Sequence, residues 1–107
     1  MSVAAITDED LAQLARALSH PARVHIVRLL ASQTECRGAD VFAEVRLAQS
    51  TVSEHLRVLA DAGIVSSRRV GTASVYCLCP ERLATLGTFV QDLLTLAPSC
   101  ATEGVCS

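Results

Sequence analysis

A short run of polar residues carries side chains that could read a nucleic acid. These side chains are short and both donate and accept hydrogen bonds: Gln49, Ser50, Thr51, Ser53 and His55. Apolar residues recur through the same stretch at three- and four-residue steps, which predicts a helix with one buried stripe. Gln can form paired hydrogen bonds with adenine, and Ser and Thr contact bases with less discrimination. At the start of a helix lying in a major groove, such residues reach base edges and phosphates.

Five thiols form the second set of residues with chemical potential: Cys36, Cys77, Cys79, Cys100 and Cys106. The acidic start of the chain lacks the basic and apolar regions of a signal peptide, and no apolar run approaches the roughly 20 residues of a membrane span. We therefore expect a cytoplasmic protein with no membrane partner, in which reducing conditions disfavour structural disulfides. Metal binding or redox sensing is the better interpretation of an odd number of thiols.

The hydrophobic pattern predicts the elements that must position these residues. Helices are expected at about residues 8–18, 21–31, 38–45, 49–62 and 80–97, and strands at 64–69 and 73–79. Thr7 should cap the first helix and Ser19 the second. Gly63 should end the fourth helix and Gly71 should permit the turn between the strands.

The fold class that follows is mainly α with a small β-hairpin, in a single domain over residues 1–107 with a cysteine-containing tail at 97–107. The formal net charge is −2, and all nine basic residues are arginine. Eight of these arginines lie between residues 16 and 69, together with only five acids. This modestly basic middle suits contacts with phosphates, although it is too weak for strong nonspecific binding.

Four segments in this order resemble the ArsR/SmtB family of bacterial winged helix-turn-helix repressors, in particular its arsenic-responsive type. They are Ala-Leu-Ser-His-Pro-Ala-Arg at 17–23, Gln-Ser-Thr-Val-Ser-Glu-His-Leu at 49–56, Ala-Gly-Ile-Val at 62–65 and Arg-Arg-Val-Gly at 68–71. The resemblance implies a homodimer formed through the first and last helices and bound to double-stranded operator DNA. It also implies that the hairpin is a wing whose Arg68, Arg69 and Thr72 lie along the DNA backbone or minor groove.

The same resemblance implies a metalloid site. Cys100 and Cys106 resemble the C-terminal cysteine pair of some arsenic-responsive members, with Ser99 standing where those members have a further cysteine. Cys36 lies in Glu-Cys-Arg-Gly-Ala-Asp at 35–40, which resembles the Glu-Leu-Cys-Val-Cys-Asp common in arsenic- and cadmium-sensing members. With the acids matched, Cys36 falls one place ahead of the first cysteine of that motif. As(III) and Sb(III) favour three thiolates, which Cys36, Cys100 and Cys106 could supply, and binding of the inducer would release the operator.

Other interpretations remain open at this point. The same fold could sense thiol oxidation or persulfides, or could respond to Cd, Pb or Cu(I), and a protein-interaction module without DNA binding is a further alternative. Cys77 and Cys79 alternate on the second expected strand, so that both sulfurs point to one face. They are either a separate metal or redox pair or strand residues without a functional role. Residues 81–96 offer no His for a zinc site, and no motif predicts an enzyme.

Overall fold

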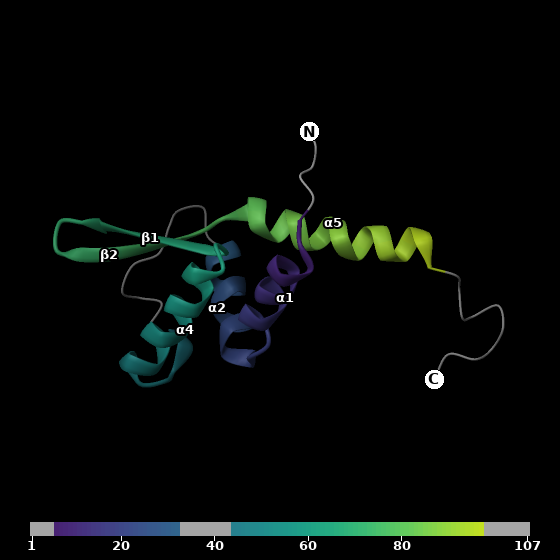
Figure 1. The fold of residues 1–107 in the computed structure, drawn as a ribbon. Coiled ribbons are helices and arrows are strands. Elements are labelled where there is room, and N and C mark those ends of the chain that lie inside the picture. The colour runs from purple at the N-terminus through teal and green to yellow at the C-terminus, as the bar shows by residue number, and fades with distance from the viewer. Residues whose placement is uncertain (1–5, 33–43, 98–107) are drawn as a thin grey trace.

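The protein is described by a computed structural model that covers residues 6–32 and 44–97. This part of the chain contains, in order, α1 (Asp8–Ala17), α2 (Pro21–Ala31), α4 (Gln49–Asp61), β1 (Val65–Val70), β2 (Ala73–Leu78) and α5 (Pro80–Leu96) (Figure 1). The helix expected at 38–45 falls mainly outside the described residues, although positions 44 and 45 are helical. The predicted class, mainly helical with a small hairpin, is confirmed.

The first helix begins as its sequence predicts. The Thr7 side chain accepts a hydrogen bond from the Asp10 backbone N–H at 3.0 Å, and three acids occupy the first turn, where the positive end of the helix dipole favours them. The second helix begins differently from the prediction. His20, rather than Ser19, is its N-cap, and the Nδ1 atom of His20 accepts from the Ala22 N–H at 3.0 Å. Ser19 is already engaged, because its hydroxyl donates to the Arg16 carbonyl oxygen at 2.7 Å at the end of α1.

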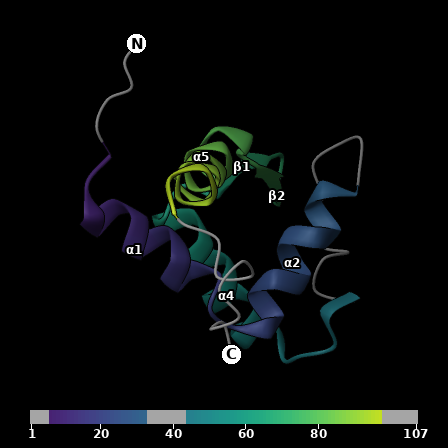
Figure 2. The ribbon, with the colours of Figure 1, turned by 90° about the vertical axis from the view of Figure 1, so that its right-hand side faces the viewer.

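A small aliphatic core lies where α1, α2, α4 and the start of the hairpin meet. Seen along the axis of α5, α1 and α2 lie on either side of α4 (Figure 2). The largest fully buried side chains come from all of these elements: Leu14, Ile26, Val52, Leu59 and Ile64. Because the core is assembled from three helices, the orientation of α4 depends directly on its contacts with α2 and α1.

The hairpin follows α4 after one tight turn. Gly63 has φ +80°, and Gly71 has φ +65° in the two-residue connection between the strands, where a left-handed backbone favours glycine. The strands are antiparallel, with Val65 opposite Leu78 and Val70 opposite Ala73. Both glycines therefore act as predicted.

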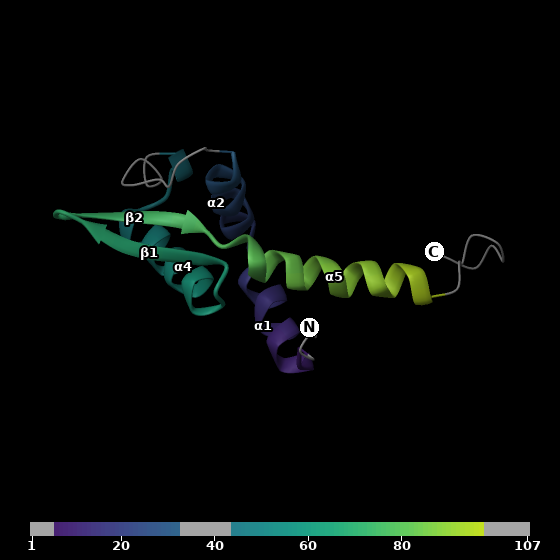
Figure 3. The same ribbon diagram turned by 90° about the horizontal axis from the view of Figure 1, so that it is seen from above.

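The last helix extends away from the rest of the chain (Figures 1 and 3). Leu83 and Leu86 in its first half pack against the core, whereas no residue of α5 is buried. Its second half exposes a row of large apolar side chains: Phe89, Val90, Leu93, Leu94 and Leu96. Within the described ranges, no helix is long and apolar enough to cross a membrane.

Candidate nucleic-acid interface

The exposed N-terminal part of α4 presents uncharged polar side chains to solvent. Gln49, Ser50, Thr51 and Ser53 are all exposed, whereas Val52 is fully buried between them. The helix is anchored through Val52, Leu56 and Leu59, so that the opposite side is free to approach another molecule. This arrangement matches the second helix of a helix-turn-helix, whose N-terminal residues contact base edges in the major groove.

The start of α4 has no side-chain cap. Ala48 is the N-cap residue and makes no capping hydrogen bond. No acidic residue occupies the first turn. The positive end of the helix dipole and its unpaired N–H groups are therefore left without a protein anion, which suits a phosphate.

In the second half of the exposed face of α4, the charged side chains pair with one another. The Arg57 guanidinium pairs with Glu54 in the preceding turn and with Asp61 in the following one, where Nη1 lies 2.8 Å from Oδ2. The hydrogen bond from Arg57 lowers the pKa of Glu54, and the same pairing raises the pKa of Arg57. Arg57 therefore contributes little net positive charge to a surface that could bind phosphates.

His55 lies apart from the other polar residues of α4. It was expected to project with the exposed group, but it is only 7% exposed and its ring faces α2. Its ring centroid lies 4.5 Å from that of His20, and its Nδ1 atom accepts a hydrogen bond from Arg23 Nε at 3.1 Å. The spacing of Val52, His55 and Leu59, at steps of three and four, is the sequence signal that could have placed His55 on the buried side.

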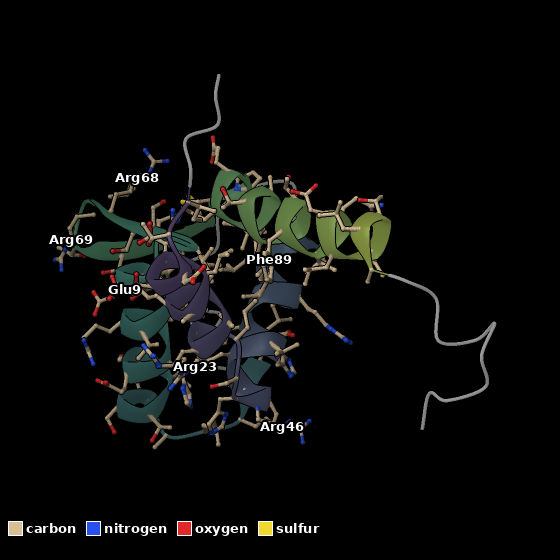
Figure 4. The ribbon with its side chains drawn as sticks, turned by 45° about the vertical axis from the view of Figure 1, so that its right-hand side comes forward. Glu9, Arg23, Arg46, Arg68, Arg69 and Phe89 are labelled. Carbon is tan, nitrogen blue, oxygen red and sulfur yellow. The ribbon has the colours of Figure 1, made fainter. Side chains whose placement is uncertain are left out.

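The hairpin carries two arginines that project to opposite sides. Alternation along β1 puts Arg69 on the same side as the buried Val65, with Arg68 on the other side, and Figure 4 shows the two side chains diverging. Arg69 Nη2 donates to the Thr72 carbonyl oxygen at 3.2 Å, which holds the guanidinium near the turn. Arg68, Arg69 and Thr72 are all exposed. The side of the hairpin that carries Arg69 is the side that faces α4.

Three residues that position α4 were missed by the sequence analysis. Arg23 on α2 bonds His55 and also donates from Nη1 to the Arg16 carbonyl oxygen at 3.2 Å (Figure 4). At the other end of α4, Gln13 donates to the Asp61 carbonyl oxygen and Arg82 to the Ala62 carbonyl oxygen, each at 3.3 Å. Hydrogen bonds between elements leave no periodic signal in a sequence, although Arg23 lies within the segment on which the family resemblance rests.

The proposed metalloid ligands Cys36, Cys100 and Cys106 all lie outside the described residues. Among the described residues, no group of three or more His, Cys, Asp or Glu side chains is arranged to hold a metal ion. β2 ends at Leu78, one residue earlier than expected, so Cys79 lies beyond the strand and is the N-cap residue of α5. Cys79 is a free, half-buried thiol, whereas Cys77 is disulfide-bonded. The two thiols therefore do not form a pair with each other.

Comparison with known proteins connects this geometry to a family. Residues 20–67 match the family of bacterial regulatory proteins described as the arsR family. An uncharacterized HTH-type transcriptional regulator of Methanocaldococcus jannaschii is 32% identical over 85 residues, which span 79% of this chain and 96% of that protein. The arsenical resistance operon repressor of Staphylococcus xylosus is 27% identical over 97 residues, spanning 91% of this chain and 92% of the repressor.

A solved structure shows the same architecture. The homodimeric winged helix-turn-helix DNA-binding domain (fragment 1-100) of a Mycobacterium bovis regulator superimposes with a TM-score of 0.65 at 27% identity. The match covers 87% of this chain and 91% of that domain. In a fold of this kind, α4 corresponds to the helix that enters the DNA groove and the β1–β2 hairpin corresponds to the wing.

Proposed function

This chain belongs to the ArsR family of winged helix-turn-helix transcriptional regulators, and on that premise we propose that it is a homodimeric repressor released from its operator by As(III) or Sb(III). The observation that carries DNA binding is the exposed, uncharged start of α4, on a chain that also presents an arginine-bearing wing. Gln49, Ser50, Thr51 and Ser53 supply base contacts, and Arg68, Arg69 and Thr72 supply contacts with the DNA backbone. His55 is not free to reach a base while it is held by Arg23.

The dimer is supported by the apolar row on α5. Leu93, Leu94 and Leu96 are 50%, 69% and 81% exposed in the single chain. Such a row on the outer half of one helix gains free energy by packing against a second copy. The similar Mycobacterium bovis domain is itself described as homodimeric. We assign the interface to α5 together with α1, which lies beside the first half of α5 in two views (Figures 1 and 3).

Release by a metalloid is supported by the chemistry of the thiols. Trivalent arsenic and antimony are soft ions that take thiolate ligands, and Cys36, Cys100 and Cys106 supply three. The similarity to the arsenical resistance operon repressor of Staphylococcus xylosus favours the same class of inducer. An inducer that binds the DNA-incompetent dimer more tightly, by about 1–3 kcal/mol, weakens operator binding by the same factor.

The test uses a duplex selected from a random-sequence library for tight binding at pH 7.5, with a fluorescent label. Arsenite added to the complex in the presence of a reductant should release this selected duplex from the wild-type protein. Cys100→Ser and Cys106→Ser should bind the duplex normally but resist release, because each variant loses one of three thiolate ligands. Cys79→Ser is the matched control and should remain inducible. Normal release from both tail variants would overturn the proposed ligand set.

A second candidate inducer is an oxidant, and it is favoured by a specific observation. Cys77 is disulfide-bonded, and its partner is not Cys79, whose thiol is free. A disulfide on β2 would place redox chemistry directly on the wing. Release of the selected duplex by a thiol oxidant without any metalloid, abolished in Cys77→Ser, would favour this sensor. Release by arsenite that requires reductant favours the metalloid sensor.

A further inference from the structure

A cluster of two histidines and one arginine joins α4, the helix that we propose reads DNA (the reading helix), to α2. His55 of α4 is 7% exposed, and its ring is tilted by 50° against the ring of His20, with the centroids 4.5 Å apart. Arg23 donates from Nε to His55 Nδ1 at 3.1 Å, and from Nη1 to the Arg16 carbonyl oxygen at 3.2 Å. One guanidinium therefore connects α1, α2 and α4 near the middle of the reading helix.

Both imidazoles accept hydrogen bonds through Nδ1. His55 accepts from Arg23, and His20 accepts from the Ala22 backbone N–H at 3.0 Å, as the N-cap of α2. An imidazole nitrogen that accepts a hydrogen bond carries no proton, so both rings are neutral and hold their single proton on Nε2. The observed contact between α2 and α4 is thus specific to the neutral form of both imidazoles.

Protonation would act against the cluster in two places. A proton on His55 Nδ1 replaces the acceptor with a donor that faces the Arg23 donor, and it adds a positive charge beside Arg23 and His20. A proton on His20 Nδ1 removes the cap of α2 and puts a cation at the positive end of the helix dipole. The acid nearest in sequence, Glu54, is paired with Arg57, and Arg16 of α1 contributes a backbone carbonyl to Arg23.

We propose that Arg23 and His20 position the reading helix through neutral His55, so that acid loosens the α2–α4 contact and weakens DNA binding. The proposal rests on the DNA-binding part of the proposed function and is independent of the inducer. In this account Arg23 and His20 are positioning residues, because they act on DNA through α4 and not by touching it.

The surroundings of His55 determine in which direction, and over which pH range, acid changes DNA binding. Burial lowers the pKa of His55 below its ordinary value of 6.5, and the electrostatic effects of His20 and Arg23 lower it further, against a smaller opposing effect of Glu54. The cluster therefore stays intact at neutral pH and opens only on acidification. Simple electrostatics predicts that acid strengthens DNA binding, because added protons raise the positive charge of the protein and strengthen its contacts with phosphates. The cluster predicts the opposite, a weaker binding of DNA in acid.

The experiment measures the Kd of the selected duplex between pH 7.5 and 5.5 at constant ionic strength. For wild type, the Kd should rise in the acid part of this range, approaching about tenfold per pH unit for one coupled proton. His55→Asn and His20→Asn keep an oxygen acceptor that does not titrate in this range and should flatten the profile. His25→Asn alters the exposed third histidine, which lies on α2 outside the cluster, and should retain the wild-type profile.

A second measurement needs neither variants nor DNA. In an NMR titration of the wild-type protein, backbone amides of α4 should shift along the titration curve of the His55 imidazole. Tight binding at pH 7.5 with a Kd that stays constant or falls on acidification would overturn the positioning role while leaving the proposed function intact. Failure to bind any duplex at pH 7.5 would instead overturn the proposed function. In that case, the positioning role would be overturned as well if the chemical shifts of the α4 backbone amides did not follow the titration curve of His55.

Discussion

The Nε atom of Arg82 donates a hydrogen bond to the carbonyl oxygen of Ala62 at 3.3 Å, which joins the first turn of α5 to the residue that ends the reading helix. The Cys79 N–H donates to the Ile64 carbonyl oxygen at 2.8 Å beside it. The junction packs closely, because a Cβ atom on Gly63 would lie 3.2 Å from both Cγ and Nε of Arg82. The helix that we assign to the dimer interface is therefore bonded directly to the end of the helix that we assign to DNA.

The two glycines with positive φ provide a matched pair for this junction. Gly71→Ala should cost about 1–2 kcal/mol in the free energy of unfolding, since only backbone strain is added and no atom lies within 4 Å of the new Cβ. Gly63→Ala should cost more, because the same strain is joined by a contact that displaces Arg82 from Ala62. Urea unfolding of both variants measures the difference. Equal losses would show that the Arg82 contact contributes nothing.

The uncapped start of α4 predicts a stabilising substitution. Ala48→Ser should add a side-chain acceptor for an N–H of the first turn and raise the free energy of unfolding by about 0.5–2 kcal/mol. Thermal melting would measure the gain. Ala60→Ser, placed in the last turn of the same helix, is a control that gains no N-terminal cap and should not stabilise. A melting temperature unchanged by Ala48→Ser would contradict the assigned N-cap.

Burial of His55 predicts that stability falls in acid. Because its pKa is lower in the folded than in the unfolded chain, the unfolded state binds more protons as the pH falls through 6.5. The stabilising contribution is therefore complete above this value and is lost progressively below it. Chemical denaturation at several pH values should show this loss for wild type, and a smaller loss for His55→Asn. An equal slope in both proteins would assign the acid sensitivity to other groups.

The apolar row on α5 predicts the effect of a single charge. Val90 is 46% exposed, and Val90→Asp would bury a carboxylate in the proposed dimer interface, which should yield monomers. Gln91→Asp alters the neighbouring exposed residue with the same charge and should leave the dimer intact. Light scattering at micromolar concentration distinguishes the two. A folded monomer for the wild-type protein would contradict the proposed interface.

Local signals in the sequence predicted most of the elements, and tertiary contacts account for the differences. Thr7, Gly63 and Gly71 act within a few residues of themselves, so their roles were visible in the chain. The cap of α2 was assigned to Ser19 instead of His20 because the competing partner of Ser19, the Arg16 carbonyl oxygen, belongs to the end of the preceding helix.

The candidate site was predicted less completely than the fold. The exposed residues of α4 and the wing followed from pattern and resemblance, but the inward orientation of His55 depends on α2 packing against α4. The bonds that Arg23, Gln13 and Arg82 make to α4 cross between elements, and periodicity carries no information about them. The cysteines proposed as ligands lie outside the described residues and stay a prediction.

The central claim is that the start of α4 reads sequence while the wing holds the DNA backbone, and binding of the selected duplex and a scrambled duplex across salt concentrations tests it most directly. Gln49→Ala should reduce the preference for the selected over the scrambled duplex, by about 1–3 kcal/mol if a bidentate contact is lost. Arg69→Ala should weaken both duplexes alike and reduce the slope of log K against log salt by about one unit. The account would be contradicted if neither substitution changed affinity, or if Arg69→Ala altered sequence preference and Gln49→Ala altered only the salt slope.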